Sequence, residues 1–296
     1  MIENGLSDKV VRWVVNVFMI FVIIIMFYPF WNVLVLSILN PADAAKPGLH
    51  LWPTSFDLTS YRVVLSSSEI GKAAVNSLIR VLAGTSLCVV GTMLTAYPLS
   101  KRNKLPGYKF WMTYILITMY FGGGLIPTYV MYKNLRMVDN FLVLILPGMI
   151  SGYNLMIVRN FLQSIPDSIE ESCKLDGASD FVVWLRVILP MSLPVAAVIA
   201  LWSAVGHWNS YFDVLIYITD RNKYVLPIIL RRVLIDGQGS QFMNPQQAAL
   251  ESGKSAPMES QTKSALIMVC SIPIILVYPF AQKYFIKGIV VGAVKG

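Results

Sequence analysis

The sequence predicts an all-α integral membrane protein with six transmembrane helices, and both composition and hydrophobic pattern support this fold class. Of the 296 residues, 56% are hydrophobic and only 14% are charged, well below the roughly 25% charged residues of soluble domains. So few ionisable groups cannot cover a water-exposed surface. The hydrophobic residues also form runs close to the roughly 20 residues that a helix needs to cross a hydrocarbon core of about 30 Å.

Six windows are long and apolar enough to be spans, and we number them one to six: about 13–39, 75–99, 110–129, 141–158, 187–206 and 265–285. The first is longer than the apolar core of a secretory signal, about 7–15 residues, and no small-residue cleavage site follows it. We therefore expect it to remain as an anchor. A further apolar run, 211–230, contains four charged residues, each costing about 2.5–3.5 kcal/mol at a helix centre. We expect that run to be interfacial or re-entrant.

Charge distribution predicts the orientation. Between spans two and three lie four basic residues with no acid among them, Lys101, Arg102, Lys104 and Lys109. Because short basic loops stay in the cytoplasm, we expect this loop, the loop between spans four and five, and both termini to be cytoplasmic. We expect residues 1–12 to form a cytoplasmic segment, 13–296 one transmembrane domain, and about 207–264 an outer loop. The net charge of +8 suits lipid head groups better than nucleic acid, because the basic residues cluster beside apolar runs.

Several kinds of chemistry are excluded by the residues present. Three widely spaced cysteines form neither a disulfide framework nor a zinc site, and we expect Cys88, Cys173 and Cys270 to be free thiols. The sequence Gly253-Lys-Ser resembles the end of a phosphate-binding loop, but Ala248 stands where that loop requires glycine. With two histidines and no nucleophile near either, hydrolase chemistry lacks its parts. We expect no enzyme activity, no metal and no cofactor bound by this chain.

A carboxylate-rich polar island at about 159–190 separates spans four and five. Pro166, Asp167 and Ser168 are typical of a helix start, and the two glutamates that follow suit the positive end of a helix. Asp176-Gly177 predicts a turn that needs a permissive backbone. We expect a helix, a turn and a second short helix lying across the membrane face. A solvated connector without a partner is the alternative.

The spacing within the island resembles a known family. Glu171-Ser-Cys, three residues, Gly177, nine residues and Val187-Ile-Leu-Pro190 resemble the EAA loop of binding-protein-dependent ABC importer permeases, E-A-A-x3-G-x9-I-x-L-P. Small Ser172 and Cys173 stand for the two alanines, and Val187 stands for isoleucine. In that family the loop is a coupling helix that docks into a cleft on an ATP-hydrolysing subunit. The resemblance implies these coupling residues: Glu170, Glu171, Ser172, Cys173, Asp176, Gly177, Ala178, Leu189 and Pro190.

Four further stretches, 122–129, 159–161, 206–212 and 278–296, resemble maltose-type carbohydrate permeases, in particular the complex-polysaccharide branch. The resemblance implies a multi-pass protein of the bacterial cytoplasmic membrane that forms half of a pathway for oligosaccharides. It also implies a second homologous permease subunit, two ATP-binding subunits that use ATP and Mg, and an extracytoplasmic sugar-binding protein. The competing interpretation is a self-sufficient ion-coupled transporter, but no predicted span contains the central Asp or Glu that such a transporter needs.

An uncharged sugar needs aromatic faces and amide hydrogen bonds. The predicted pathway residues are Tyr120, Gly123, Asn154, Trp208 and Asn209. The glycines 122–124 indicate either a kinked packing helix or an opened stretch beside a cavity. His207 and Trp208 are either sugar contacts or an aromatic belt, and we expect Arg80 to extend toward the membrane interface.

Overall fold

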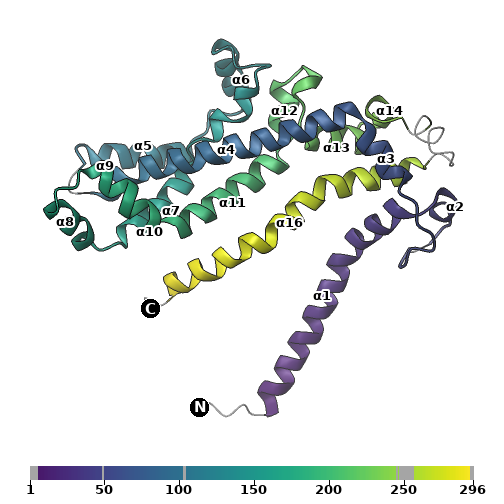
Figure 1. The fold of residues 1–296 in the computed structure, drawn as a ribbon, viewed down its shortest axis with the longest axis horizontal. Coiled ribbons are helices and arrows are strands. Elements are labelled where there is room, and N and C mark those ends of the chain that lie inside the picture. Colours follow the sequence, from purple (N-terminus) through teal and green to yellow (C-terminus); the bar gives the residue numbers. More distant parts are fainter. Residues whose placement is uncertain (1–5, 49, 103–104, 245, 247–256, 294–296) are drawn as a thin grey trace. The chain divides into compact units, whose positions relative to one another are not determined.

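The computed structural model describes residues 6–48, 50–102, 105–244, 246 and 257–293, and every regular element in these residues is a helix (Figure 1). The all-α prediction is confirmed for them. The chain divides into two compact units. The first unit contains Met1–Ile70 and Arg232–Ile272, and the second contains Gly71–Arg231 and Pro273–Gly296.

Helices of different lengths account for most of the described residues. The α-helices are α1 (Leu6–Ile38), α2 (Pro41–Ala44), α3 (Thr59–Ser66), α4 (Ser68–Ser100), α5 (Tyr108–Tyr120), α6 (Leu125–Asn134), α7 (Gly152–Gln163), α8 (Asp167–Leu175), α9 (Asp180–Val183), α10 (Leu189–Met191), α11 (Leu193–Asn209), α12 (Phe212–Tyr217), α13 (Leu226–Leu234), α14 (Gly239–Phe242) and α16 (Glu259–Ala293). Short 3₁₀ segments are η1 (Phe141–Leu144), η2 (Leu146–Gly148) and η4 (Arg221–Lys223), and η3 (Trp184–Ile188) is a π-helical turn.

Four helical stretches among the described residues are long and apolar enough to cross a membrane: Lys9–Ile38, Ser68–Ser100, Phe141–Gln163 and Glu259–Val277. Two bent pairs also qualify when each pair counts as one span: Tyr108–Tyr120 with Leu125–Asn134, and Asp180–Met191 with Leu193–Asn209. Each of the six predicted spans overlaps one of these stretches. By length and composition the described chain therefore contains four to six spans, and the run 211–230 is not among them.

The predicted spans three to five are not straight helices, and this corrects the sequence interpretation. In span three, α5 and α6 meet at 116° across a break at 121–124. Each glycine in that break weakens a helix by roughly 1 kcal/mol, and Gly124 has φ +80°. The helix is therefore broken at these glycines, but none of them is among the residues that line the cavity around Arg80, so the predicted position beside a cavity is not confirmed. Span four begins with 3₁₀ turns because Pro147 cannot donate to a continuing helix. In span five, α9–α10 and α11 meet at 74°.

In the first unit, polar contacts join helices across its core. The Gln261 side chain donates to the Leu39 carbonyl at 2.6 Å, and the hydroxyls of Ser37 and Tyr61 lie 2.8 Å apart. Most of α1 makes no such contact: the apolar window within Lys9–Ile38 is 0% buried. Its aliphatic and aromatic side chains therefore remain available to lipid or to a partner protein.

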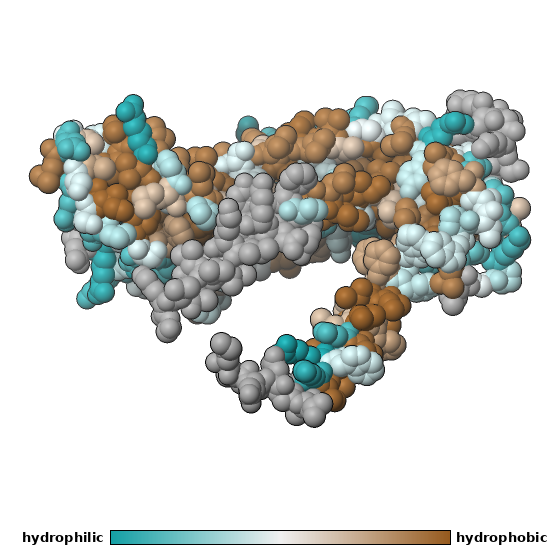
Figure 2. Space-filling model, turned by 60° about the horizontal axis from the view of Figure 1, so that its bottom comes forward, coloured by the Kyte–Doolittle hydropathy of each residue, from teal (hydrophilic) through white to brown (hydrophobic). Residues whose placement is uncertain are grey.

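In the second unit, side chains from α4, α7, α9, η3 and α11 form one hydrophobic core, which includes Met93, Leu155, Val158, Ile188 and Ile199. α7 also lies close to α5 at Gly152, where an added Cβ would be 2.6 Å from Met119 Cγ. Figure 2 shows a broad band of hydrophobic residues over the middle of this unit. These contacts fix the helices around the two features considered next.

Candidate functional site

The polar island forms the predicted helix, turn and helix. α8 begins at Asp167 after Pro166 and ends at Leu175. Behind it, Ala178 N–H donates to the Cys173 carbonyl and Gly177 N–H to the Lys174 carbonyl, both at 3.0 Å, which is the Schellman pattern for ending a helix. Gly177 has φ +82°, and an added Cβ there would meet no atom within 4 Å. Glycine is therefore required by the backbone conformation and not by crowding within this chain.

α8 is tied to α4 by its inner face. Glu170 is 4% exposed, and its Oε1 lies 2.5 Å from Lys101 Nζ, just beyond the last residue of α4. The same Nζ lies 3.1 Å from Asp167 Oδ1. One lysine thus holds both the first residue and the first turn of α8. It also brings the basic loop after α4 and the acidic island to the same end of the second unit.

The outer face of α8 is open. Leu175 is 89% exposed, and Phe181 in α9 is also exposed. Lys174 forms an ion pair with Asp180 across the turn, and this hydrogen-bonded partner raises the pKa of Lys174. Among the predicted coupling residues, the exposed ones are Glu171, Ser172, Asp176, Gly177 and Pro190, the half-buried ones are Cys173, Ala178 and Leu189, and Glu170 is buried. Exposed apolar side chains therefore lie beside charged ones on this outer face.

The second feature is an open cavity of about 500 Å³ in the second unit. Its lining includes Arg80 from α4, Tyr132 from α6, Asn154 from α7, Trp202 and His207 from α11, and Asp213 from α12. Aromatic faces, an amide and charged groups therefore meet in one space. This mixture suits a polar ligand with apolar C–H surface, such as a saccharide.

Arg80 is the central charge of the cavity and corrects a prediction. We expected it to extend to the membrane interface, but it is 2% exposed. It forms an ion pair with Asp213, and its Nη1 donates to the Ser210 carbonyl at 3.0 Å. Asp213 balances the charge of the guanidinium inside the protein, so the side chain need not reach lipid head groups. Arg80 Nε is buried and has no hydrogen-bond partner among the described residues.

His207 is held between two glycines. A Cβ added to Gly84 on α4 would lie 2.3 Å from His207 Nε2, and one added to Gly148 would lie 3.4 Å from its Cε1. Only a residue without a side chain at position 84 leaves room for the ring. His207 therefore lines the cavity and does not form an aromatic belt. Its neighbour Trp208 is 8% exposed and also lies away from the protein surface where a belt would be.

The segment 210–224 contributes to the cavity wall and is hydrogen-bonded to α4. Residues four apart lie on one helix face, and Lys72, Asn76 and Arg80 all bond to the segment 210–224. Lys72 Nζ donates to Asn222 Oδ1 at 3.2 Å, and Asn76 Nδ2 donates to the Asn222 carbonyl at 2.7 Å. This row fixes the position of Asp213 relative to Arg80.

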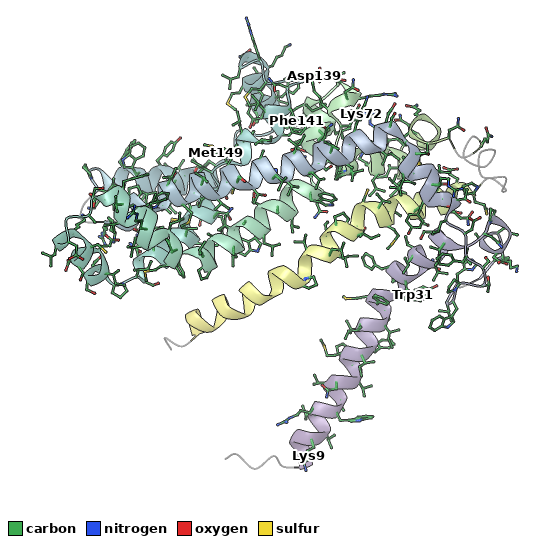
Figure 3. All side chains as sticks on the ribbon, viewed as in Figure 1. Lys9, Trp31, Lys72, Asp139, Phe141 and Met149 are labelled. Carbon is green, nitrogen blue, oxygen red and sulfur yellow. The ribbon has the colours of Figure 1, made fainter. Side chains whose placement is uncertain are left out.

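Asp139 fastens the same segment from its other side. The Asp139 carboxylate accepts the backbone N–H groups of Thr219 and Asp220 at 3.1 Å each. The hydrogen bond from the backbone N–H of Asp220 is the main reason why the pKa of Asp139 is lowered. Figure 3 labels Asp139, Lys72 of the row on α4, Phe141 at the start of η1, and Met149 directly after η2.

The predicted pathway residues separate into two groups. Asn154 lines the cavity. Four do not: Tyr120, Gly123, Trp208 and Asn209. Tyr120 and Gly123 are exposed at the α5–α6 break, where Tyr120 is 80% exposed.

Sequence reasoning missed Arg80, Tyr132, Trp202 and Asp213 as cavity residues. The available signal was Arg80 itself, because an ionisable residue within an apolar span is by default a functional candidate. Cys88, Cys173 and Cys270 are free thiols, as predicted. No group of three or more His, Cys, Asp or Glu in the described chain is placed to hold a metal.

Comparison with known proteins agrees with this architecture. The family model "Binding-protein-dependent transport system inner membrane component" matches residues 3–291. The "Polygalacturonan/rhamnogalacturonan transport system permease protein YtcP" of Bacillus subtilis (strain 168) is 37% identical, over 99% of this chain and 100% of that protein. "Protein LplC" of the same organism is also 37% identical, over 90% of this chain and 89% of that protein.

Among solved structures, one titled "Crystal structure of a bacterial ABC transporter involved in the import of the acidic polysaccharide alginate" matches with a TM-score of 0.86 and 28% identity, covering 95% of this chain and 98% of that one. A family match over almost the whole sequence, two relatives of similar length and a solved transporter of the same fold lead to one conclusion: this chain belongs to the binding-protein-dependent transport system inner membrane component family.

Proposed function

We propose that this chain is one permease subunit of an ATP-driven ABC importer and forms half of a translocation pathway for oligosaccharides. The observation that carries the proposal is α8, an exposed helix that ends in a Schellman turn and has the spacing Glu171 to Pro190 of the EAA loop. Family membership supports the importer class. The names of the relatives support polysaccharide-derived substrates.

The proposed topology has six spans with both termini in the cytoplasm. The Lys101–Glu170 ion pair supports it, because this pair joins the loop after span two to the island between spans four and five. Two loops on one membrane side require an even number of spans between them. The six-span topology places two spans, three and four, between these loops. The basic composition of the first loop favours the cytoplasm for that side. In this arrangement residues 13–296 form the transmembrane domain, about 159–190 the coupling loop and about 207–264 the outer loop.

The proposed partners follow from these surfaces. Two ATP-binding subunits supply ATP and Mg chemistry, and one of them docks on the exposed side of α8 around Glu171 and Leu175. A second, homologous permease covers apolar helix surface and completes the pathway. An extracytoplasmic sugar-binding protein delivers substrate to the outer loop. The proposed sugar contacts are Asn154 in the cavity and, elsewhere on the pathway, Tyr120, Gly123, Trp208 and Asn209.

The test is import by the complete complex in proteoliposomes. The complex contains this chain with its companion permease, ATP-binding subunits and binding protein, and labelled trigalacturonate and a neutral galactose trisaccharide are offered in turn. We expect saccharide accumulation that requires both ATP and the binding protein, and none in vesicles prepared without this chain. Accumulation driven by a proton or sodium gradient without the ATP-binding subunits would establish the ion-coupled alternative. Import of neither saccharide class, nor of any other oligosaccharide offered, would refute the proposal.

A further inference from the structure

We propose that the cavity of the second unit is a binding site for the carboxylate of an acidic sugar, with Arg80 as the residue that contacts it and Asp213 as the residue that positions Arg80. This inference rests on the proposed function and makes its substrate class specific. It concerns a site within this chain, separate from any selection by an external binding protein.

Arg80 has a hydrogen-bond donor that is not used within the described part of the chain. One terminal nitrogen donates to the Ser210 carbonyl and the other pairs with Asp213. The Nε–H has no partner among the described residues, although the side chain is 2% exposed. A buried donor without an acceptor is costly. Arg80 lines the cavity, but its Nε is itself buried, so a ligand oxygen supplies the missing acceptor only after the side chains around Nε shift.

The guanidinium of Arg80 determines which kind of acceptor fits. A guanidinium carries a permanent charge and presents donors in a planar fork that fits a carboxylate. A hydroxyl would satisfy the donor but would not use the charge. The remaining lining fits the body of a sugar: Trp202 and Tyr132 supply aromatic faces, and Asn154 supplies an amide. The volume of about 500 Å³ lies within the roughly 300–1,000 Å³ of typical ligand pockets.

Asp213 positions Arg80 and balances its charge. Its Oδ1 accepts from Ser210 Oγ and from Val214 N–H at 2.9 Å each, while its Oδ2 faces Arg80. The Arg80–Asp213 pair is therefore electroneutral and held in one arrangement. An entering carboxylate gains the Arg80 charge but is repelled by Asp213, so it binds weakly and can leave again. A transport pathway needs this property, because a site that binds tightly retains its cargo.

An ion pair that only stabilises the fold is the competing explanation. The two explanations predict opposite responses to two neutralising substitutions. If the cavity binds a carboxylate, Arg80→Gln weakens binding of an acidic sugar, whereas Asp213→Asn removes the repulsion and tightens it. If the pair is purely structural, both substitutions disturb the same contact and shift binding in the same direction or leave it unchanged.

The experiment is equilibrium dialysis of labelled trigalacturonate against the purified complex of both permeases and the ATP-binding subunits, without the binding protein. We expect saturable binding that falls roughly 10- to 100-fold in Arg80→Gln, the effect of losing a charge-assisted hydrogen bond. We expect Asp213→Asn to bind more tightly than wild type, and a neutral galactose trisaccharide to bind alike in all variants. Lys109→Gln is the matched control, because it removes an exposed cation of the same unit that does not line the cavity, and it should change nothing.

Several results would overturn the inference: no saturable binding by the wild-type complex, equal losses for the acidic and neutral sugars, or parallel shifts in the two variants. Complex yield and melting temperature are recorded for each variant, and Arg80→Lys, which keeps the charge, should retain part of the binding if Arg80→Gln fails to assemble. The proposed function fails separately, when the wild-type complex imports no saccharide. If import is normal but the carboxylate effect is absent, only this inference fails.

Discussion

Replacing Lys101 by methionine removes the cation that joins α4 to α8 and keeps most of the apolar stem. The Glu170 side chain is 5% exposed and that of Lys101 16%, so the substitution leaves a carboxylate buried without its ion-pair partner. Removing one member of a buried pair costs about 3–5 kcal/mol. The residual exposure of Lys101 favours the lower value, about 3 kcal/mol. The contact with Asp167, which is 75% exposed, adds little because water screens it.

A loss of about 3 kcal/mol corresponds to a roughly 150-fold shift of the equilibrium between docked and undocked α8, since 1.4 kcal/mol is tenfold. Hydrogen exchange of the α8 amides in the purified complex measures this shift, and sugar-stimulated ATP hydrolysis measures its effect on coupling. We expect fast exchange in α8 and reduced stimulation in Lys101→Met, with both largely restored in Lys101→Met/Glu170→Gln, where no unpaired buried charge remains. Lys109→Met removes an exposed lysine of the same basic loop and is the control.

Unchanged exchange in α8 together with unchanged stimulation in Lys101→Met would refute this reasoning. The same holds if the double variant is worse than the single one, because the defect would then not come from an unpaired carboxylate.

Four further outcomes are expected. Gly177→Val should abolish import at normal membrane abundance, because φ +82° costs a β-branched residue roughly 1–3 kcal/mol; normal uptake would show that the turn can change. Glu171→Lys should reduce co-purification of the ATP-binding subunit through charge reversal, and undiminished co-purification would leave Glu171 with a local helix role only. Gly84→Val should displace His207 and lower import, because an added Cβ would lie 2.3 Å from its Nε2, whereas unaltered import would mean that the ring position is unimportant. The pKa of Asp139 is lowered from 3.8, so its contribution to loop stability is present above pH 3.8 and is lost as the pH falls through the lower folded pKa. Hydrogen exchange of the two amides that it binds should therefore stay slow down to about pH 4. Acceleration of this exchange near pH 6 would contradict the assignment.

The parts of the fold that were predictable depend on local signals. The start of α8 follows from Pro166 and the acidic first turn, and its end follows from Gly177, because both ends are set by residues adjacent in sequence. Span positions follow from the length of apolar runs. The two neighbouring glutamates differ in a way that depends on tertiary contacts. Both were predicted as coupling residues, but consecutive residues point about 100° apart on a helix, and only the tertiary contact with Lys101 shows that Glu170 faces inward.

The cavity was not predictable in the same way. Arg80 meets Asp213 and Ser210 only because the segment after α11 is fastened along α4, and these partners are 133 and 130 positions away. Sequence spacing gives no measure of such a contact. The break at 121–124 was ambiguous for a related reason, since glycines in a membrane helix permit close packing as readily as an opened backbone.

The docking of an ATP-binding subunit on α8 is the central claim, and photo-crosslinking from position 175 tests it most directly. Leu175 is 89% exposed on α8, and Tyr120, 80% exposed at the end of α5, is the control position. With a photoreactive amino acid at position 175 in a transport-active complex, we predict a crosslink to the ATP-binding subunit, and none from position 120. Absence of the crosslink at 175, or equal crosslinking from both positions, would contradict the account.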